Sequence, residues 1–305
     1  MDYRKAMGVE RLCAASRGAY GVRIAILDSG CPKYAFGGGI ARSCVPSSGP
    51  DDEYGHATAI SSILFGGRGI VGICGACHPL YVKVLDDNGC GTIESVVAGI
   101  YEALDCNVDL INLSLGFVRT EKCPESLEKA CEAAFEAGKP IICAAGNDGG
   151  RVNWPAALKT TICVGSEAKN GLKTAFSSAG EVDFVAPGLN LPVSGVDGRI
   201  KMVSGTSFST ALVTGVAACL IRKMNVDGVK ISVEGVKNAL KDVAIDLGEP
   251  GWDENTGYGL VFGKKVDPTA HLKIGKGFFG RILDKVRATI RLLTKPSKGV
   301  QNGRV

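Results

Sequence analysis

Histidine is scarce in this chain. Only three of its 305 residues are histidine, namely His56, His78 and His271, so any mechanism that needs an imidazole has three candidates. Internal repeats are also absent, which excludes an architecture of stacked repeats. Acidic and basic residues nearly balance, with a formal net charge of +4. No nucleic-acid partner is therefore expected.

The amino terminus lacks the apolar core of a secretory signal peptide. The chain begins Met-Asp-Tyr-Arg-Lys, in which charged and polar residues interrupt any apolar run. The 12 cysteines are scattered among apolar neighbours or in surface-like helical stretches, whereas an exported protein is expected to pair or lose its cysteines. We therefore expect a reducing, cytoplasmic setting.

The remaining composition suits one large α/β domain. Apolar runs typical of strands alternate with helical patterns, which predicts a mainly parallel central sheet with helices on both faces. The expected strands are 22–28, 80–85, 108–114, 140–145, 161–165, 182–186 and 200–204, and the expected helices are 56–65, 92–105, 125–138, 206–223 and 232–241. Residues 202–221 carry no charge, but Gly, Ser, Thr and Ala dominate them, which favours a buried helix over a membrane span.

One serine stands at the start of that uncharged helix. Ser207 lies in Gly-Thr-Ser-Phe-Ser, between small residues. A helix N-terminus has unpaired N–H groups and a partial positive charge, so an oxyanion that forms beside this serine is stabilised there. Ser207 is therefore a candidate nucleophile.

A serine needs a neighbouring base, and two upstream motifs supply a histidine for that role and a carboxylate to accompany it. His56 follows a glycine and precedes small residues in Gly-His-Ala-Thr, at an expected helix start. Asp28 ends the apolar run 22–28, which resembles a buried parallel strand with a carboxylate at its carboxyl end. Open α/β sheets build their sites at such strand ends.

Further segments accompany these three motifs: Asn112–Gly116 (Asn-Leu-Ser-Leu-Gly), Ala144–Asn147 (Ala-Ala-Gly-Asn), Trp154–Ala156 (Trp-Pro-Ala) and Val185–Gly188 (Val-Ala-Pro-Gly). Together, in the order Asp, His, Ser, they resemble the subtilisin-like serine proteases, or subtilases. The resemblance runs from about residue 8 to about residue 267. It implies the three-layer subtilisin-like fold and serine endopeptidase activity.

The resemblance also implies a role for each site residue. Asp28 would orient and stabilise the His56 imidazolium, His56 would act as base and then as acid, and Ser207 would attack the peptide carbonyl. Asn147 would donate its side-chain amide to the oxyanion, beside the backbone N–H of Ser207. Taken alone, Asn147 also suits a turn in Gly-Asn-Asp-Gly-Gly.

Three short segments are expected to bind the substrate. The family pairs an extended peptide with two backbone edges, so main-chain hydrogen bonds give affinity and side-chain pockets give selectivity. The expected substrate-binding residues are Gly89, Cys90 and Gly91 on one edge, Ser114, Leu115 and Gly116 on the other, and Ala144, Ala145 and Gly146 along one wall of the pocket.

The chain departs from the family in two places that matter. The loop in which many subtilases hold calcium is Phe65–Val71 here, without a carboxylate and with Arg68, so no metal site and no cofactor is expected. Only 27 residues precede Asp28, so we expect no inhibitory prodomain.

Other functions fit the sequence less well. An α/β-hydrolase would need G-x-S-x-G with the acid and the histidine after the serine, but the motif at Ser207 lacks the last glycine and only His271 follows it. Residues 74–78 match the haem-attachment pattern C-x-x-C-H, although small buried side chains entering a strand explain them as well. The remaining alternatives are a catalytically silent subtilase fold that binds peptides and a membrane-associated effector.

The carboxyl-terminal part of the chain is different in composition. Residues 273–305 hold nine Lys or Arg and one acid, Asp284, and their apolar residues recur at helical spacing. We therefore predict a catalytic domain over 1–270 and a basic amphipathic extension over 271–305. The extension either packs on the domain, stays solvated, or docks through 273–305 to an anionic membrane surface or an acidic partner.

Removal of calcium is expected to leave peptide hydrolysis unchanged, because the Phe65–Val71 loop offers no carboxylate to a calcium ion. Hydrolysis rate and melting temperature, measured before and after dialysis against EDTA, test this. A calcium-dependent subtilase treated in parallel is the control. An activity that EDTA abolishes and calcium restores would contradict the prediction.

Overall fold

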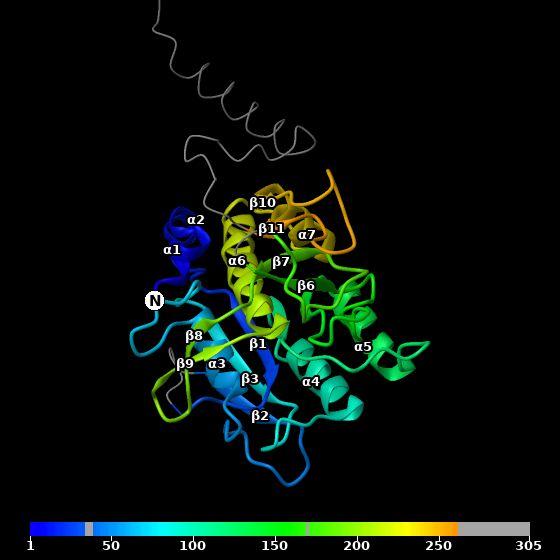
Figure 1. The fold of residues 1–305 in the computed structure, drawn as a ribbon. Helices are drawn as coiled ribbons and strands as arrows, with labels where there is room; N and C mark the ends of the chain where they lie inside the picture. Colours follow the sequence, from blue (N-terminus) through cyan, green and yellow to red (C-terminus); the bar gives the residue numbers. More distant parts are fainter. Residues whose placement is uncertain (34–38, 169–170, 262–305) are drawn as a thin grey trace, which may run out of the picture. The chain divides into compact units, whose positions relative to one another are not determined.

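A computed structural model describes residues 1–33, 39–168 and 171–261 (Figure 1). The chain divides into two compact units, Met1–Val266 and Asp267–Val305. The first unit contains every residue predicted for the site. The predicted extension 271–305, with its proposed docking segment 273–305, lies outside the described residues.

A nine-stranded sheet forms the centre of the described part of the chain, in the order β10-β11-β7-β6-β5-β4-β1-β3-β2 (Figure 1). All neighbouring strands in it are parallel except the pair β10–β11. The strands are β1 (Arg23–Asp28), β2 (Ile40–Ser43), β3 (His78–Lys83), β4 (Leu110–Leu113), β5 (Ile141–Ala144), β6 (Ile162–Glu167), β7 (Phe184–Pro187), β10 (Ala244–Ile245) and β11 (Leu260–Val261). Because parallel strands point the same way, β1, β4 and β5 end at the same edge of the sheet.

Helices cover both faces of this sheet. They are α1 (Tyr3–Met7), α2 (Glu10–Ala15), α3 (His56–Leu64), α4 (Ile93–Asp105), α5 (Glu125–Glu136), α6 (Thr206–Val226) and α7 (Val233–Val243). Alternate side chains of β1 enter different cores: Ile24 and Ile26 pack with α3 and α6, whereas Ala25 and Leu27 pack with α4 and α5. This period of two is what a strand that is buried on both faces requires. The predicted α/β fold with a mainly parallel, helix-covered sheet is confirmed.

Helix α6 is the uncharged helix that the sequence predicted, and it is a core helix. Residues 206–221 are all buried, and the helix contacts β4, β5, β6 and β7 (Figure 1). A Cβ on Gly215 would lie 2.9 Å from the Cβ of Ile73, so the glycine permits close packing against the segment after α3. No helix among the described residues combines the length and apolarity needed to cross a bilayer.

The predicted strand at 200–204 exists but does not join the main sheet. It is β9 (Ile200–Val203), and it pairs antiparallel with β8 (Leu191–Ser194) in a separate two-stranded ribbon. Apolar periodicity identifies a strand without naming its partner, and in β9 the first three residues are exposed. The short helices α1 and α2 were not predicted, since five and six residues are too few to establish a period.

Candidate active site

The site lies where strand ends of the sheet meet the first residues of two helices. Asp28 is the last residue of β1, His56 is the first residue of α3, and Ser207 is the second residue of α6. Gly55, with φ 98°, is the residue at which the chain turns into α3. Residues far apart in the sequence thus reach one edge of the sheet, as the motifs predicted.

Asp28 and His56 form a direct pair. Nδ1 of His56 lies 2.8 Å from Oδ1 and 2.9 Å from Oδ2 of Asp28. The carboxylate is fully buried, and the imidazole side chain is 19% exposed. Since an ionised carboxylate only accepts hydrogen bonds, Nδ1 carries the proton and Nε2 is left as the acceptor of the neutral ring. The histidine is therefore oriented as a general base must be.

The surroundings of His56 favour its protonated form. Burial alone lowers the pKa of His56, but the charge of Asp28, its hydrogen bond and, as the last contribution, the charge of Asp52 raise it. The net effect is a pKa above the ordinary value of histidine. An imidazolium that forms during a reaction is stabilised by the same groups.

Ser207 is held at the start of α6 by a reciprocal contact with Ser114. Its Oγ donates to the backbone carbonyl of Ser114 at 2.9 Å, and Oγ of Ser114 donates to the Ser207 carbonyl at 2.8 Å. The next residue, Phe208, contacts the His56 ring with a centroid distance of 5.7 Å. In this structure the Ser207 hydroxyl therefore bonds to Ser114, which directly follows β4. The neighbouring Phe208 packs on the imidazole of His56.

Asn147 adjoins the same helix start. Its Oδ1 accepts from the backbone N–H of Thr206 at 2.8 Å and from Oγ1 of Thr206 at 3.0 Å. These two bonds fix the amide so that its Nδ2 lies near Gly205. A Cβ on Gly205 would be 3.5 Å from this nitrogen. Asn147 is exposed. It therefore presents an amide N–H₂ at the N-terminus of α6, and it also serves as a cap for that helix.

The first predicted substrate edge, Gly89 to Gly91, follows a turn at Asp87 and Asn88. The Asp86 carboxylate accepts from the backbone N–H groups of Asn88 and Cys90, both at 2.9 Å. Gly89 has φ 77°, and a Cβ there would lie 2.5 Å from the Tyr54 ring. Cys90 and Gly91 are exposed. This edge is therefore accessible, and glycine at 89 allows Tyr54 to pack against it.

The second edge continues from the end of β4. Ser114 is buried, and Gly116 is exposed. Phe117 then pairs with Trp154 through N–H···O bonds of 2.7 and 3.0 Å. Leu115 and Gly116 lie outside the helices and strands. Within the described ranges, their backbone groups make no hydrogen bond to another backbone group. An unpaired stretch of this kind suits strand addition.

The predicted wall residues lie at the end of β5. Ala144 and Ala145 are buried, while Gly146 has φ 118°, and a Cβ on it would lie 2.7 Å from atoms of Asn153 and Ser178. Its N–H donates to Oγ1 of Thr206 at 3.3 Å. The structure thus brings Gly146 and Asn147 against the first residue of the Ser207 helix.

Polar residues behind Asp28 and His56 were missed in the sequence. Ser29, Asp52 and Lys83 are all fully buried. Nζ of Lys83 donates to the carbonyls of Ser29 at 2.7 Å and Asp51 at 3.0 Å, and it pairs with Asp87 at 2.8 Å. The sequence did contain a signal for Asp52. Aspartate commonly caps helices, and Asp52 stands just before the expected start of the helix 56–65.

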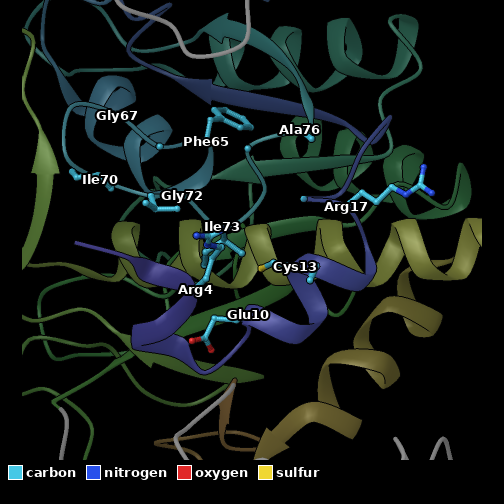
Figure 2. Close-up of a pocket in the computed structure, with 15 residues that line it drawn as sticks. Arg4, Glu10, Cys13, Arg17, Phe65, Gly67, Ile70, Gly72, Ile73 and Ala76 are labelled. Carbon is cyan, nitrogen blue, oxygen red and sulfur yellow. The ribbon is translucent and has the colours of Figure 1, made fainter. Parts of the chain in front are cut away.

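One cavity of the described residues lies apart from this arrangement. Within the described ranges, no three His, Cys, Asp or Glu side chains form a group that holds a metal ion. A cavity of about 500 Å³ opens between the first two helices and residues 65–76 (Figure 2), and no residue predicted for the site lines it.

The comparisons with known proteins agree on one family. The sequence profile of the subtilase family matches residues 19–259. The chain is 32% identical over 249 residues to the minor extracellular protease Epr of Bacillus subtilis (strain 168), covering 79% of this chain and 37% of Epr. It is 36% identical over 216 residues to a thermostable alkaline protease of Halalkalibacterium halodurans, covering 67% of this chain and 58% of the relative. The chain thus spans about a third to three fifths of the length of these two relatives.

A solved structure shows the same fold. The prenylagaramide maturation protease PagA superposes with a TM-score of 0.73 at 29% sequence identity, and the match covers 83% of this chain and 95% of PagA. The similarity therefore extends over most of the described residues.

We expect His56 to titrate above the ordinary histidine value, and Asp28→Asn to lower its pKa, because the Asp28 charge favours the imidazolium. Protonated His56 stabilises the fold below its unfolded pKa, and this contribution is lost as pH rises through the folded pKa. Proton NMR measures the titration, and the signal that His56→Gln removes identifies the residue. A midpoint at or below the ordinary value would contradict the prediction.

Proposed function

Since the chain belongs to the subtilase family, we propose that it is a serine endopeptidase that hydrolyses peptide bonds through an acyl-enzyme on Ser207. The observation that carries the proposal is the buried Asp28–His56 pair, whose imidazole contacts Phe208, the residue after Ser207 at the N-terminus of α6. A peptide-binding fold without activity has no need to bury a carboxylate against a histidine in this orientation. The pair therefore favours catalysis over the silent alternative.

The first step transfers a proton as the new bond forms. Oγ of Ser207 attacks the carbonyl carbon of the scissile peptide, and its proton passes to Nε2 of His56. The hydroxyl bonded to the Ser114 carbonyl reaches this orientation by rotation about the Cα–Cβ bond of Ser207. The positive charge that develops on His56 faces the carboxylate of Asp28. His56 then returns the proton to the leaving amine.

The negative charge develops on the carbonyl oxygen of the substrate. The backbone N–H of Ser207 and the side-chain amide of Asn147 lie at the start of α6, where the helix dipole is also favourable. Because Thr206 already binds Oδ1 of Asn147, the amide is oriented before the substrate arrives. Donors fixed in advance cost no reorganisation in the transition state.

We propose an extended peptide as the substrate. Its backbone would add as a strand between residues 89–91 and residues 114–116, with Ala144, Ala145 and Gly146 beside the residue before the scissile bond. Glycines on both edges allow the peptide backbone to approach closely.

We also propose a cytoplasmic setting for this activity. All twelve cysteines are free thiols, and seven of them are buried. An oxidising compartment favours proteins whose cysteines are paired. The cysteine content therefore supports a reducing compartment.

Ser207→Ala and His56→Ala are each expected to reduce peptide hydrolysis by about 10⁴-fold or more, because nucleophile and base act as a unit. Steady-state hydrolysis of a fluorogenic peptide library measures the effect. Ser209→Ala is the matched control: Ser209 lies on the same helix and donates to the Ala186 carbonyl at 3.0 Å. Wild-type hydrolysis by Ser207→Ala would show that the proposal is wrong.

Asn147→Ala is expected to lower kcat by about 10²–10³ with little change in KM, since the amide acts on the oxyanion of the transition state. Asn147→Asp separates this role from helix capping, because it keeps an acceptor for Thr206 and removes the donor. Both variants should lose kcat to at least this extent. Normal turnover by Asn147→Asp would assign Asn147 to capping alone.

A further inference from the structure

A second buried carboxylate lies behind the histidine. Asp52 is fully buried, and it stands four positions before His56 in the sequence. Its Oδ1 accepts from the Gly55 N–H at 2.7 Å, and its Oδ2 accepts from the Thr58 N–H at 2.8 Å and from Oγ1 of Thr58 at 2.5 Å. Gly55 itself has no side chain with which to cap α3. Asp52 therefore satisfies the free N–H groups at the start of the helix on which His56 is the first residue.

Asp52 is also connected to the partner of the histidine. Oγ of Ser29 lies 2.8 Å from Oδ1 of Asp52 and 3.2 Å from Oδ1 of Asp28. The same oxygen accepts from the Ala57 N–H at 2.9 Å. Ser29 has one hydroxyl proton, which the shorter distance assigns to Asp52. One hydroxyl thus joins the end of β1, the Asp52 carboxylate and the first turn of α3.

This arrangement fixes both members of the Asp28–His56 pair relative to each other. Asp28 accepts from the Ser29 N–H at 2.7 Å, so Ser29 orients the carboxylate, while Asp52 holds the helix end that carries the imidazole. All four contacts of Asp52 are short, and the residue has no exposure to solvent. A buried carboxylate with donors on both oxygens is held rigidly, since an unsatisfied donor there is costly.

The charges around His56 are few, so the electrostatic effect of Asp52 is identifiable. Asp28 and Asp52 are the charges that raise its pKa. Lys83 lies behind the strand ends, where it binds the carbonyls of Ser29 and Asp51 and pairs with Asp87. Helix α6, which contacts the imidazole through Phe208, has no charged residue from Thr206 to Ile221.

We propose that Asp52 is a positioning residue of the catalytic machinery, which acts on His56 through Ser29 and the N-terminus of α3 and supplies a second negative charge to the imidazolium. The inference rests on the proposed serine endopeptidase function. It explains why a carboxylate is buried at this position, where the neutral caps Ser or Asn would also satisfy helix N–H groups. Asp52 touches neither the substrate nor the reacting atoms.

The test compares Asp52→Asn with a matched control, Asp253→Asn. Asp253 makes the same kind of contacts, accepting from the backbone N–H groups of Asn255 and Thr256 at 2.8 and 3.0 Å and from Oγ1 of Thr256. It lies between β10 and β11, at the opposite end of the sheet from β3 and β2. Both substitutions remove a carboxylate that accepts from backbone N–H groups, and only Asp52 lies beside His56.

For Asp52→Asn we expect kcat to fall by about 10- to 100-fold with KM changed less than about twofold, as for a misplaced catalytic group. The acid limb of the profile of kcat/KM against pH should move to lower pH, because one charge that favours the imidazolium is removed. The pKa of His56, measured by NMR, should fall with it. Asp253→Asn should keep the wild-type kcat and pH limb, whatever its melting temperature.

An Asp52→Asn enzyme with wild-type kcat and an unmoved pH limb would overturn the inference, and so would a loss of kcat equal to that of Asp253→Asn. If Asp52→Asn does not fold, Ser29→Ala decides, since it breaks the bridge and leaves the charge. An unchanged kcat in Ser29→Ala then contradicts the positioning role. Failure of the proposed function is distinguishable from this, because the wild-type protein would then show no peptide hydrolysis that depends on Ser207.

Discussion

The contact between the buried Asp28 carboxylate and Nδ1 of His56 is the interaction on which the rest of the site depends. A buried carboxylate without a partner is strongly destabilising, and removal of one member of such a pair commonly costs about 3–5 kcal/mol. Asp28 therefore requires a donor at the end of β1. The sheet supplies the position of the carboxylate, and the start of α3 supplies the imidazole.

The other polar groups of the site are arranged around that pair through helix starts. Asp52 caps α3 behind the histidine, and Asn147 binds the first turn of α6 beside the serine. Lys83 holds two loop carbonyls at the strand ends and thereby fixes the segment between them. Each helix N-terminus thus has a partner within the protein, while the side chains assigned to chemistry remain at the open edge. This division between supporting and reacting groups is what preorganisation requires.

Local sequence signals predicted most of this framework. The apolar run that ends at Asp28 and the uncharged stretch after Gly205 are both continuous, and the structure has a buried strand and a buried helix there. The scarcity of histidine made His56 easy to identify. The ribbon β8–β9 was harder, because pairing depends on partners distant in the sequence. Ser29 and Asp52 were missed for a similar reason, since their role exists only when β1 and α3 meet.

The central claim is that His56 activates Ser207 as a nucleophile, and covalent labelling tests it most directly. A fluorophosphonate reacts with an activated serine, and mass spectrometry of the digested protein locates the adduct. The account predicts one adduct, on the peptide that contains Ser207, no labelling of Ser207→Ala, and greatly slowed labelling of His56→Ala. Protein that hydrolyses peptides but takes the label on another serine, or on none, would contradict it.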